Sequence, residues 1–95
     1  LMNDSVILRF LMKFSEDKTF STLENSLANG NIEEAFRAAH TLKGLCLNLG
    51  FNDLYAPSAE LTEILRVGKT DGAGELFEKV EEKYGTVING IKNLD

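Results

Sequence analysis

The residues best suited to chemistry lie in one short segment around His40, the only histidine of the chain. Lys43 follows it by three residues and Gly44 by four, while Arg37 precedes it by three. A neutral imidazole is a good nucleophile toward an activated phosphoryl group, and an unperturbed histidine is mostly neutral at cytosolic pH. The two nearby cations disfavour the imidazolium form and suit the negative charge that a phosphoryl group brings. These residue types therefore favour phosphoryl chemistry at His40.

The helical pattern of this segment displays His40 instead of burying it. At about 100° per residue, seven apolar residues share one face, and His40 points almost directly away from them. Gly44 lies one turn further on, where glycine costs about 1 kcal/mol relative to alanine, so we expect the space above it to be needed. Phe36 and Leu47 share the outward face. Apolar residues exposed around a polar centre indicate a docking surface. The inward face comprises Ala35, Ala38, Ala39, Leu42, Leu45, Cys46 and Leu49.

Simpler explanations exist for these residues. A solitary exposed histidine is usually a solvated surface residue, and Phe36 or Leu47 alone could pack against an N-terminal helix. One histidine and one cysteine, about 120° apart on their helix, form neither a structural zinc site nor a Cys-His catalytic pair. The glycine-rich stretch 68–74 lacks the spacing and the Gly-Lys-Ser/Thr ending of a phosphate-binding loop. We therefore expect no metal site and no cofactor of the chain's own.

Length and composition predict one helical domain. The 95 residues are enough for a single modest core, 43% of them are hydrophobic, and helix-forming types dominate. The net charge of −5 without a clustered basic face argues against nucleic-acid binding. No apolar run approaches the roughly 18 residues of a membrane helix, and the N-terminus lacks the features of a signal peptide. We therefore expect a cytoplasmic protein with no membrane insertion.

The single cysteine and the first residue bear on the context of the chain. Cys46 permits no internal disulfide, so a reducing compartment is expected, with the thiol packed as a small hydrophobe in the core. The chain begins with Leu1 rather than methionine, which favours a fragment of a longer protein. No repeat, low-complexity tract or interdomain linker interrupts residues 1–95, which we interpret as one domain.

Two helices are predicted before the histidine segment. Asp4 or Ser5 caps a first short helix that ends at about Phe14 and covers one end of a bundle. Ser15 caps a second helix, which stops at Asn29-Gly30, a left-handed stop signal. The residues expected to face inward are Ile7, Phe10, Leu11 and Phe14 in the first helix and Phe20, Leu23 and Leu27 in the second.

The third helix, over residues 32–49, carries His40 and has signals at both ends. Asn31 is an N-cap residue, and Glu34 is placed so that its carboxylate reaches back in a capping box. Gly50 is a C-terminal cap, so the second glycine of the segment has a structural role.

Pro57 makes the start of the fourth helix ambiguous. A helix that begins at Asn52 or Asp53 and runs to Gly68 has this proline beyond its first turn, where proline is disruptive. The sequence therefore predicts either a start near Ala56 or a kink. The inward residues are expected to be Leu54, Leu61, Ile64 and Leu65.

A long last helix completes the predicted fold. The connection over 68–74 contains three glycines, and Thr70-Asp71 is placed to cap the helix that follows. Short links make neighbouring helices antiparallel, so the sequence predicts an all-α, up-down-up-down four-helix bundle with an extra short N-terminal helix. The apolar stripe of the last helix is Ala73, Leu76, Phe77, Val80, Tyr84, Val87, Ile88, Ile91 and Leu94.

The segment HTLKGLCLNLG resembles the phosphoacceptor motif of histidine-containing phosphotransfer (HPt) domains, His-x-Leu-Lys-Gly followed by a glycine six residues later. The match fixes His40, Leu42, Lys43, Gly44 and Gly50, and the expected helices extend the resemblance over nearly the whole chain. It implies that His40 is the phosphorylated residue, that Lys43 supports the phosphoryl group and that Gly44 leaves room for the partner's active site.

The resemblance also implies what a partner must supply. Phosphoryl transfer usually needs a divalent metal and in-line positioning, yet Glu33 is the only carboxylate on the His40 face. We therefore expect a receiver domain to supply the metal and the reacting aspartate. The expected function is a phosphorelay intermediate without kinase activity of its own, in which His40 accepts a phosphoryl group from one receiver domain and passes it to another. Response-regulator receivers and hybrid sensor kinases are the expected partners of a monomeric domain.

Two alternatives stay open at this point. The phosphoacceptor domain of a chemotaxis-type histidine kinase shares the His-x-x-Lys-Gly motif, but such domains usually carry a Leu-Glu pair on the following helix, where this chain reads Leu61-Thr62. Glu60 or Glu63 would substitute if the helix phase is shifted. The other alternative is a helical adaptor that binds receivers without relaying phosphate. The sequence does not identify the cognate kinase, the pathway output, the direction of flow or whether the domain is free or tethered.

Overall fold

The computed structural model describes residues 4–94, which form five helices and no strand. The predicted all-α class is confirmed. The molecule is elongated, with extents of 43 × 20 × 18 Å. The helices are α1 (Asp4–Glu16), α2 (Thr19–Ala28), α3 (Ile32–Leu49), α4 (Asn52–Arg66) and α5 (Ala73–Lys92).

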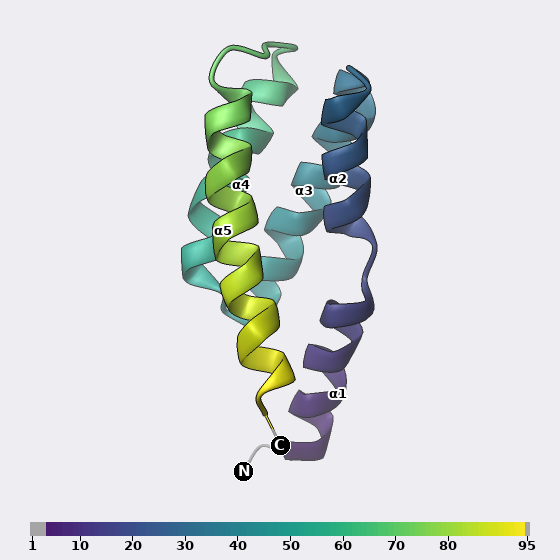
Figure 1. The fold of residues 1–95 in the computed structure, drawn as a ribbon, viewed down its shortest axis with the longest axis vertical. Helices are drawn as coiled ribbons and strands as arrows, with labels where there is room; N and C mark the ends of the chain where they lie inside the picture. Colours follow the sequence, from purple (N-terminus) through teal and green to yellow (C-terminus); the bar gives the residue numbers. More distant parts are fainter. Residues whose placement is uncertain (1–3, 95) are drawn as a thin grey trace.

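Helices α2 to α5 form an antiparallel bundle, and α1 extends it at one end. Along the chain, α2 packs on α3, α3 on α4, and α4 on α5. The ring is closed by aromatic side chains, since Phe20 of α2 stacks on Tyr84 and Phe77 of α5 at centroid distances of 4.2 and 5.5 Å. Figure 1 shows α1 beyond the start of α2, beside the C-terminal half of α5. The predicted four-helix bundle with an extra N-terminal helix is therefore confirmed.

Both ends of α3 follow the sequence signals. The Asn31 side chain accepts a hydrogen bond from the Glu34 amide at 3.1 Å, as an N-cap residue should. Gly50 has a left-handed φ of 78°, and the Phe51 amide donates to the Cys46 carbonyl at 2.9 Å, the bond of a glycine-terminated helix. The predicted Asn29-Gly30 stop after α2 is also confirmed, because Gly30 has a φ of 73°.

The reciprocal half of the expected capping box is wrong. The Glu34 carboxylate does not reach back to the Asn31 amide. It accepts a hydrogen bond from the buried Ser26 hydroxyl at 2.7 Å, while the Asn31 amide donates to the Ser26 carbonyl at 2.9 Å. The turn after α2 satisfies the Asn31 amide first, which leaves the carboxylate free to tie α2 to α3.

The predicted cap of α2 is also wrong. Ser15 lies inside α1, which continues to Glu16, and its hydroxyl donates to the Met12 carbonyl at 2.7 Å. A side chain that bonds within its own helix cannot cap the next one. The N-cap residue is Lys18, whose side chain makes no capping bond, and the Asp17 carboxylate just before it accepts a hydrogen bond from the Thr19 amide at 2.7 Å.

One of the two alternatives for α4, a start near Ala56, is wrong, and so is the expected cap of α5. Helix α4 starts at Asn52 rather than near Ala56 and continues through buried Pro57. Proline has no backbone N–H, so the carbonyl four residues earlier, at Asp53, lacks its usual hydrogen-bond donor. Asp53 lies in an exposed turn that is open to water. Thr70-Asp71 does not cap α5. The N-cap residue is Gly72, and no side chain caps it.

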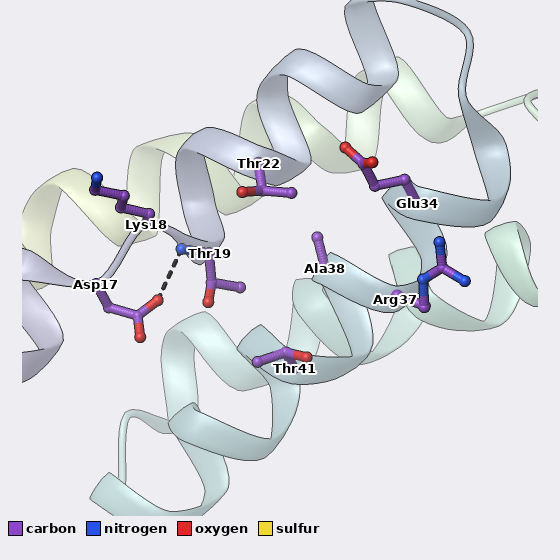
Figure 2. Close-up of a pocket in the computed structure, with 8 residues that line it drawn as sticks. All are labelled: Asp17, Lys18, Thr19, Thr22, Glu34, Arg37, Ala38 and Thr41. Atoms are coloured by element: carbon purple, nitrogen blue, oxygen red, sulfur yellow. Dashed lines mark hydrogen bonds between the residues drawn. The ribbon is translucent and has the colours of Figure 1, made fainter.

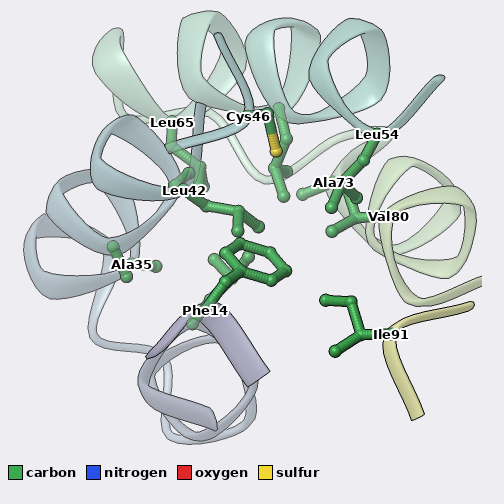
Figure 3. Packing of buried hydrophobic residues seen from close by; sticks show 13 residues of the cluster. Phe14, Ala35, Leu42, Cys46, Leu54, Leu65, Ala73, Val80 and Ile91 are labelled. Atoms are coloured by element: carbon green, nitrogen blue, oxygen red, sulfur yellow. The ribbon is translucent and has the colours of Figure 1, made fainter. Parts of the chain in front are cut away.

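The core lies along the axis of α2 to α5, and α1 contributes a single fully buried side chain. Phe14 is 3% exposed and packs against the rings of Phe51 and Tyr84 at centroid distances of 5.1 and 5.8 Å. Phe10 and Leu94 were expected inside, but they are 53% and 48% exposed, because no further helix of residues 4–94 covers α1 at this end (Figure 1). Figure 3 shows the buried cluster, which includes Ala35, Leu42, Cys46, Leu54, Leu65, Ala73, Val80 and Ile91.

Candidate functional site

His40 lies on the outward face of α3, as the helical pattern predicts. Its side chain is exposed, whereas Ala39, Leu42 and Cys46 on the opposite face are buried. Residues on both sides of His40 therefore belong to one continuous surface of α3. This surface borders α4 on one flank and α2 on the other.

The flank toward α4 is filled by side chains. The Phe36 ring stacks against the His40 ring, with 6.0 Å between centroids and 29° between planes. The guanidinium of Arg66, the last residue of α4, lies over the Phe36 ring at 5.0 Å from its centroid. The Glu63 carboxylate holds the Arg66 guanidinium, with Nε to Oε1 at 3.2 Å and Nη2 to Oε2 at 3.3 Å. Phe36 is thus partly covered rather than a freely exposed docking residue.

Lys43 lies on the same flank of α3 as Phe36, by the angular spacing of the helix. Its side chain is partly buried. Within the part of the chain that the structure describes, the ion pairs involve other cations, so the Lys43 ammonium has no carboxylate partner. A long lysine side chain that buries its stem and keeps its charge in solvent remains able to meet an incoming anion.

Arg37 lies on the flank toward α2, and its charge is already shared. Its guanidinium bonds the Glu33 carboxylate at 2.9 Å, one turn earlier on α3, and both side chains are largely exposed. Arg37 and Lys43 therefore flank His40 as expected. Of these two cations, Lys43 is the one without a carboxylate partner among residues 4–94.

Gly44 opens the flank toward α2. A Cβ built at this position would meet no atom within 4 Å, so nothing inside the described structure requires glycine there. An open groove of about 680 Å³ lies between α2 and α3 on the same flank; Thr41, three residues before Gly44, lines it, and Gly44 itself does not. Figure 2 shows Thr22 of α2 facing Ala38 and Thr41 of α3 across this groove. The residues that line it are Asp17, Lys18, Thr19, Thr22, Glu34, Arg37, Ala38 and Thr41.

The remaining predicted docking residue and the buried cysteine lie where expected. Leu47 is 66% exposed on the outward face of α3. Cys46 is fully buried, and burial raises the pKa of its thiol to about 11, an effect that the nearby Ser58 hydroxyl partly offsets. The Ser58 oxygen lacks hydrogen-bond geometry with any described group, so the interaction between the Ser58 hydroxyl and the Cys46 thiol is weak. The thiol stays protonated at neutral pH and is not a nucleophile.

The place where a kinase-type glutamate was considered holds no such contact. Leu61 and Thr62 are fully buried, and the Thr62 hydroxyl donates to the Ser58 carbonyl at 2.7 Å. Glu63 bonds Arg66. Within residues 4–94, no hydrogen bond or ion pair joins a carboxylate to His40.

Arg66 is the residue of this site that sequence reasoning missed. A signal for it exists, because α3 and α4 form an antiparallel hairpin around Gly50, and Phe36 and Arg66 are about equally far from that glycine. Residues at matching distances from such a turn lie at the same height in the bundle. The predicted helix bounds would have placed an arginine beside Phe36.

Comparison with known protein families gives a match over nearly the whole chain. A family model, described as Hpt domain, matches residues 10–92. Comparison with curated proteins and with solved structures gives no match. The matched range includes the whole of α2 to α5 and the C-terminal half of α1.

Proposed function

Because the chain belongs to the Hpt domain family, in which the domain serves phosphotransfer in two-component signalling, we propose that it is a phosphorelay intermediate. His40 accepts a phosphoryl group from the aspartyl phosphate of one receiver domain and passes it to the aspartate of another. The observation that carries the proposal is an exposed histidine with an unpaired lysine on one flank and open space above Gly44 on the other.

The proposed transfer step needs little from this chain beyond the nucleophile. The lone pair of the unprotonated ring nitrogen attacks phosphorus, the P–N bond forms, and the P–O bond to the aspartate breaks with its electron pair left on the carboxylate. The ring then carries a positive charge that is relieved when the other nitrogen releases its proton to solvent. Lys43 faces the charge on the phosphoryl oxygens and stabilises the transition state and the phosphorylated state.

A divalent metal is expected on the receiver side of the interface. Within the described chain, no three His, Cys, Asp or Glu side chains cluster in a way that could hold a metal ion. The metal and the reacting aspartate are therefore assigned to the partner, and this chain supplies the acceptor, a cation and access. It has no kinase activity of its own in this proposal.

The partners follow from the same chemistry. Receivers of response regulators and of hybrid sensor kinases present an aspartyl phosphate beside a bound metal, which suits an exposed histidine on a helix. None of the helices within residues 4–94 is apolar and long enough to cross a membrane. We propose that the domain acts in the cytoplasm as a monomer, because each transfer needs one His40 and one receiver.

The test is incubation with receiver domains phosphorylated by a small-molecule donor. The expected result is label on the chain that is stable to base and labile to acid, and that passes to a second receiver. His40→Gln is expected to abolish this label while the free energy of unfolding changes by less than about 0.5 kcal/mol, because the side chain is exposed. Receiver binding without any label would identify a helical adaptor, and label from ATP would identify a kinase.

A further inference from the structure

The exposed imidazole of His40 is restrained by a ring contact and not by a hydrogen bond. Catalytic histidines are commonly oriented by a hydrogen bond to the second ring nitrogen. Within residues 4–94, the His40 ring contacts the Phe36 ring, with 6.0 Å between the ring centroids and 29° between the ring planes. Within the described residues, Phe36 is therefore the neighbour placed to orient the His40 ring.

Phe36 can act as a support because it is itself held on both sides. Its side chain is partly buried, and it packs against the core cluster. The Arg66 guanidinium covers its ring at 5.0 Å, and Glu63 fixes that guanidinium through two of its nitrogens. The order His40, Phe36, Arg66, Glu63 thus forms a continuous stack from α3 to α4.

We propose that Phe36 is a positioning residue, held by Arg66, that keeps the His40 ring in one orientation for phosphoryl transfer. The inference rests on the relay function proposed above. Transfer requires the ring nitrogen to lie in line with the breaking P–O bond, and small misplacements of a reacting group lower rates steeply. A free imidazole on an exposed helix samples several rotamers. The Phe36 ring blocks one flank, and the flank left open is the one with Gly44.

The first test separates positioning from docking. Phe36→Leu removes the flat ring but keeps an apolar side chain of similar size, and Phe36→Tyr restores the ring. Leu47→Ala is the matched control, because Leu47 lies on the same outward face and is 66% exposed. With saturating phosphorylated receiver, Phe36→Leu is expected to lower the maximal transfer rate about fivefold with little change in KM. Phe36→Tyr is expected to restore the rate, and Leu47→Ala to change KM only.

The second test needs no receiver. Since His40 is the only histidine, its ring protons and its side-chain couplings are readable without overlap by NMR. We expect one dominant His40 rotamer and a contact with the Phe36 ring in the parent, and averaged couplings in Phe36→Leu. Circular dichroism confirms that both chains are folded.

Two results would overturn the proposal. One is a parent His40 with averaged couplings, and the other is a Phe36→Leu variant that transfers at the parent rate under saturating receiver. If the parent accepts no phosphoryl group at all, the relay function is wrong, and the couplings still decide whether Phe36 fixes the ring. Failure of the function and failure of the positioning role are therefore distinguishable.

Discussion

The two flanks of His40 differ in how they are occupied. Toward α4, the Phe36 ring packs against the imidazole, the Arg66 guanidinium lies over the Phe36 ring, and the Glu63 carboxylate bonds Arg66. Toward α2, Gly44 has no neighbour near the position of a Cβ, and the same flank carries an open groove lined by Arg37, Ala38 and Thr41 of α3. In the proposed relay, one flank restrains the nucleophile and the other admits a reacting partner.

This difference gives separate physical roles to residues that share one helix surface. A restraint needs a rigid neighbour with its own support, which the hairpin partner α4 supplies. An approach route needs missing atoms, which a glycine within a helix supplies at some cost in stability. Substitutions on the two flanks are therefore expected to affect transfer in different ways, and each prediction below tests that separation.

The largest effect is expected from filling the open flank. Gly44→Gln is expected to reduce phosphoryl transfer to background, because a long side chain one turn from His40 would stand where the aspartyl phosphate must approach. The variant is expected to fold at least as well as the parent, since no internal atom obstructs a Cβ there and glutamine favours helices more than glycine. Transfer rates and thermal melting curves of the same samples check this.

Two outcomes would contradict the role assigned to the flank that carries Gly44. Transfer at the parent rate by the Gln variant would show that the approach does not pass over Gly44. A melting temperature far below the parent value would show that the glycine is needed for packing.

An intermediate effect is expected from removing the unpaired cation. Lys43→Ala should slow transfer about tenfold and weaken receiver binding less, because its charge matters most while the phosphoryl group arrives and while it is bound. Transfer rates at saturating receiver, together with a binding titration against unphosphorylated receiver, separate the two quantities. Equal losses in rate and affinity would make Lys43 a docking contact only.

Much of the fold was predictable because the signals are local. The apolar spacing placed Ala39, Leu42 and Cys46 inside and His40 outside, and Asn31 and Gly50 marked the ends of its helix. In each case the decisive neighbours lie within about one turn of the residue, so periodicity and capping rules apply directly.

The errors occur where residues had a choice of distant or competing partners. Glu34 was expected to bond its own helix start, but it bonds the Ser26 hydroxyl across the turn. Ser15 was expected to cap α2, but α1 continues two residues past Phe14, to Glu16, and includes it. Arg66 was overlooked because its role depends on the height at which α4 passes Phe36. Such contacts follow from the packed structure and not from spacing along one helix.

A small effect is expected from the cation that is already paired. Arg37→Ala should change the transfer rate by less than about twofold, because the Glu33 carboxylate already offsets the guanidinium charge at 2.9 Å. An exposed pair of this kind stabilises a helix by about 0.3–0.5 kcal/mol. A double comparison with Glu33→Gln sharpens the test, since that change frees Arg37 and should raise the rate slightly. A tenfold loss in Arg37→Ala would place a second phosphoryl-supporting cation on the open flank.

The smallest effect on transfer is expected from the smallest addition to the open flank, Gly44→Ala. The methyl group meets no atom within 4 Å, and alanine removes conformational freedom from the unfolded chain, so the free energy of unfolding should rise by up to about 1 kcal/mol. Because a methyl group extends far less than a glutamine side chain, transfer should stay within about 1.5-fold of the parent rate. Denaturant unfolding and transfer assays on the parent, Ala and Gln variants then give two opposite trends, with stability retained or raised and transfer falling as the side chain lengthens. A destabilised Ala variant would mean that glycine serves the fold of α3, and the open flank would lose its interpretation as an approach route.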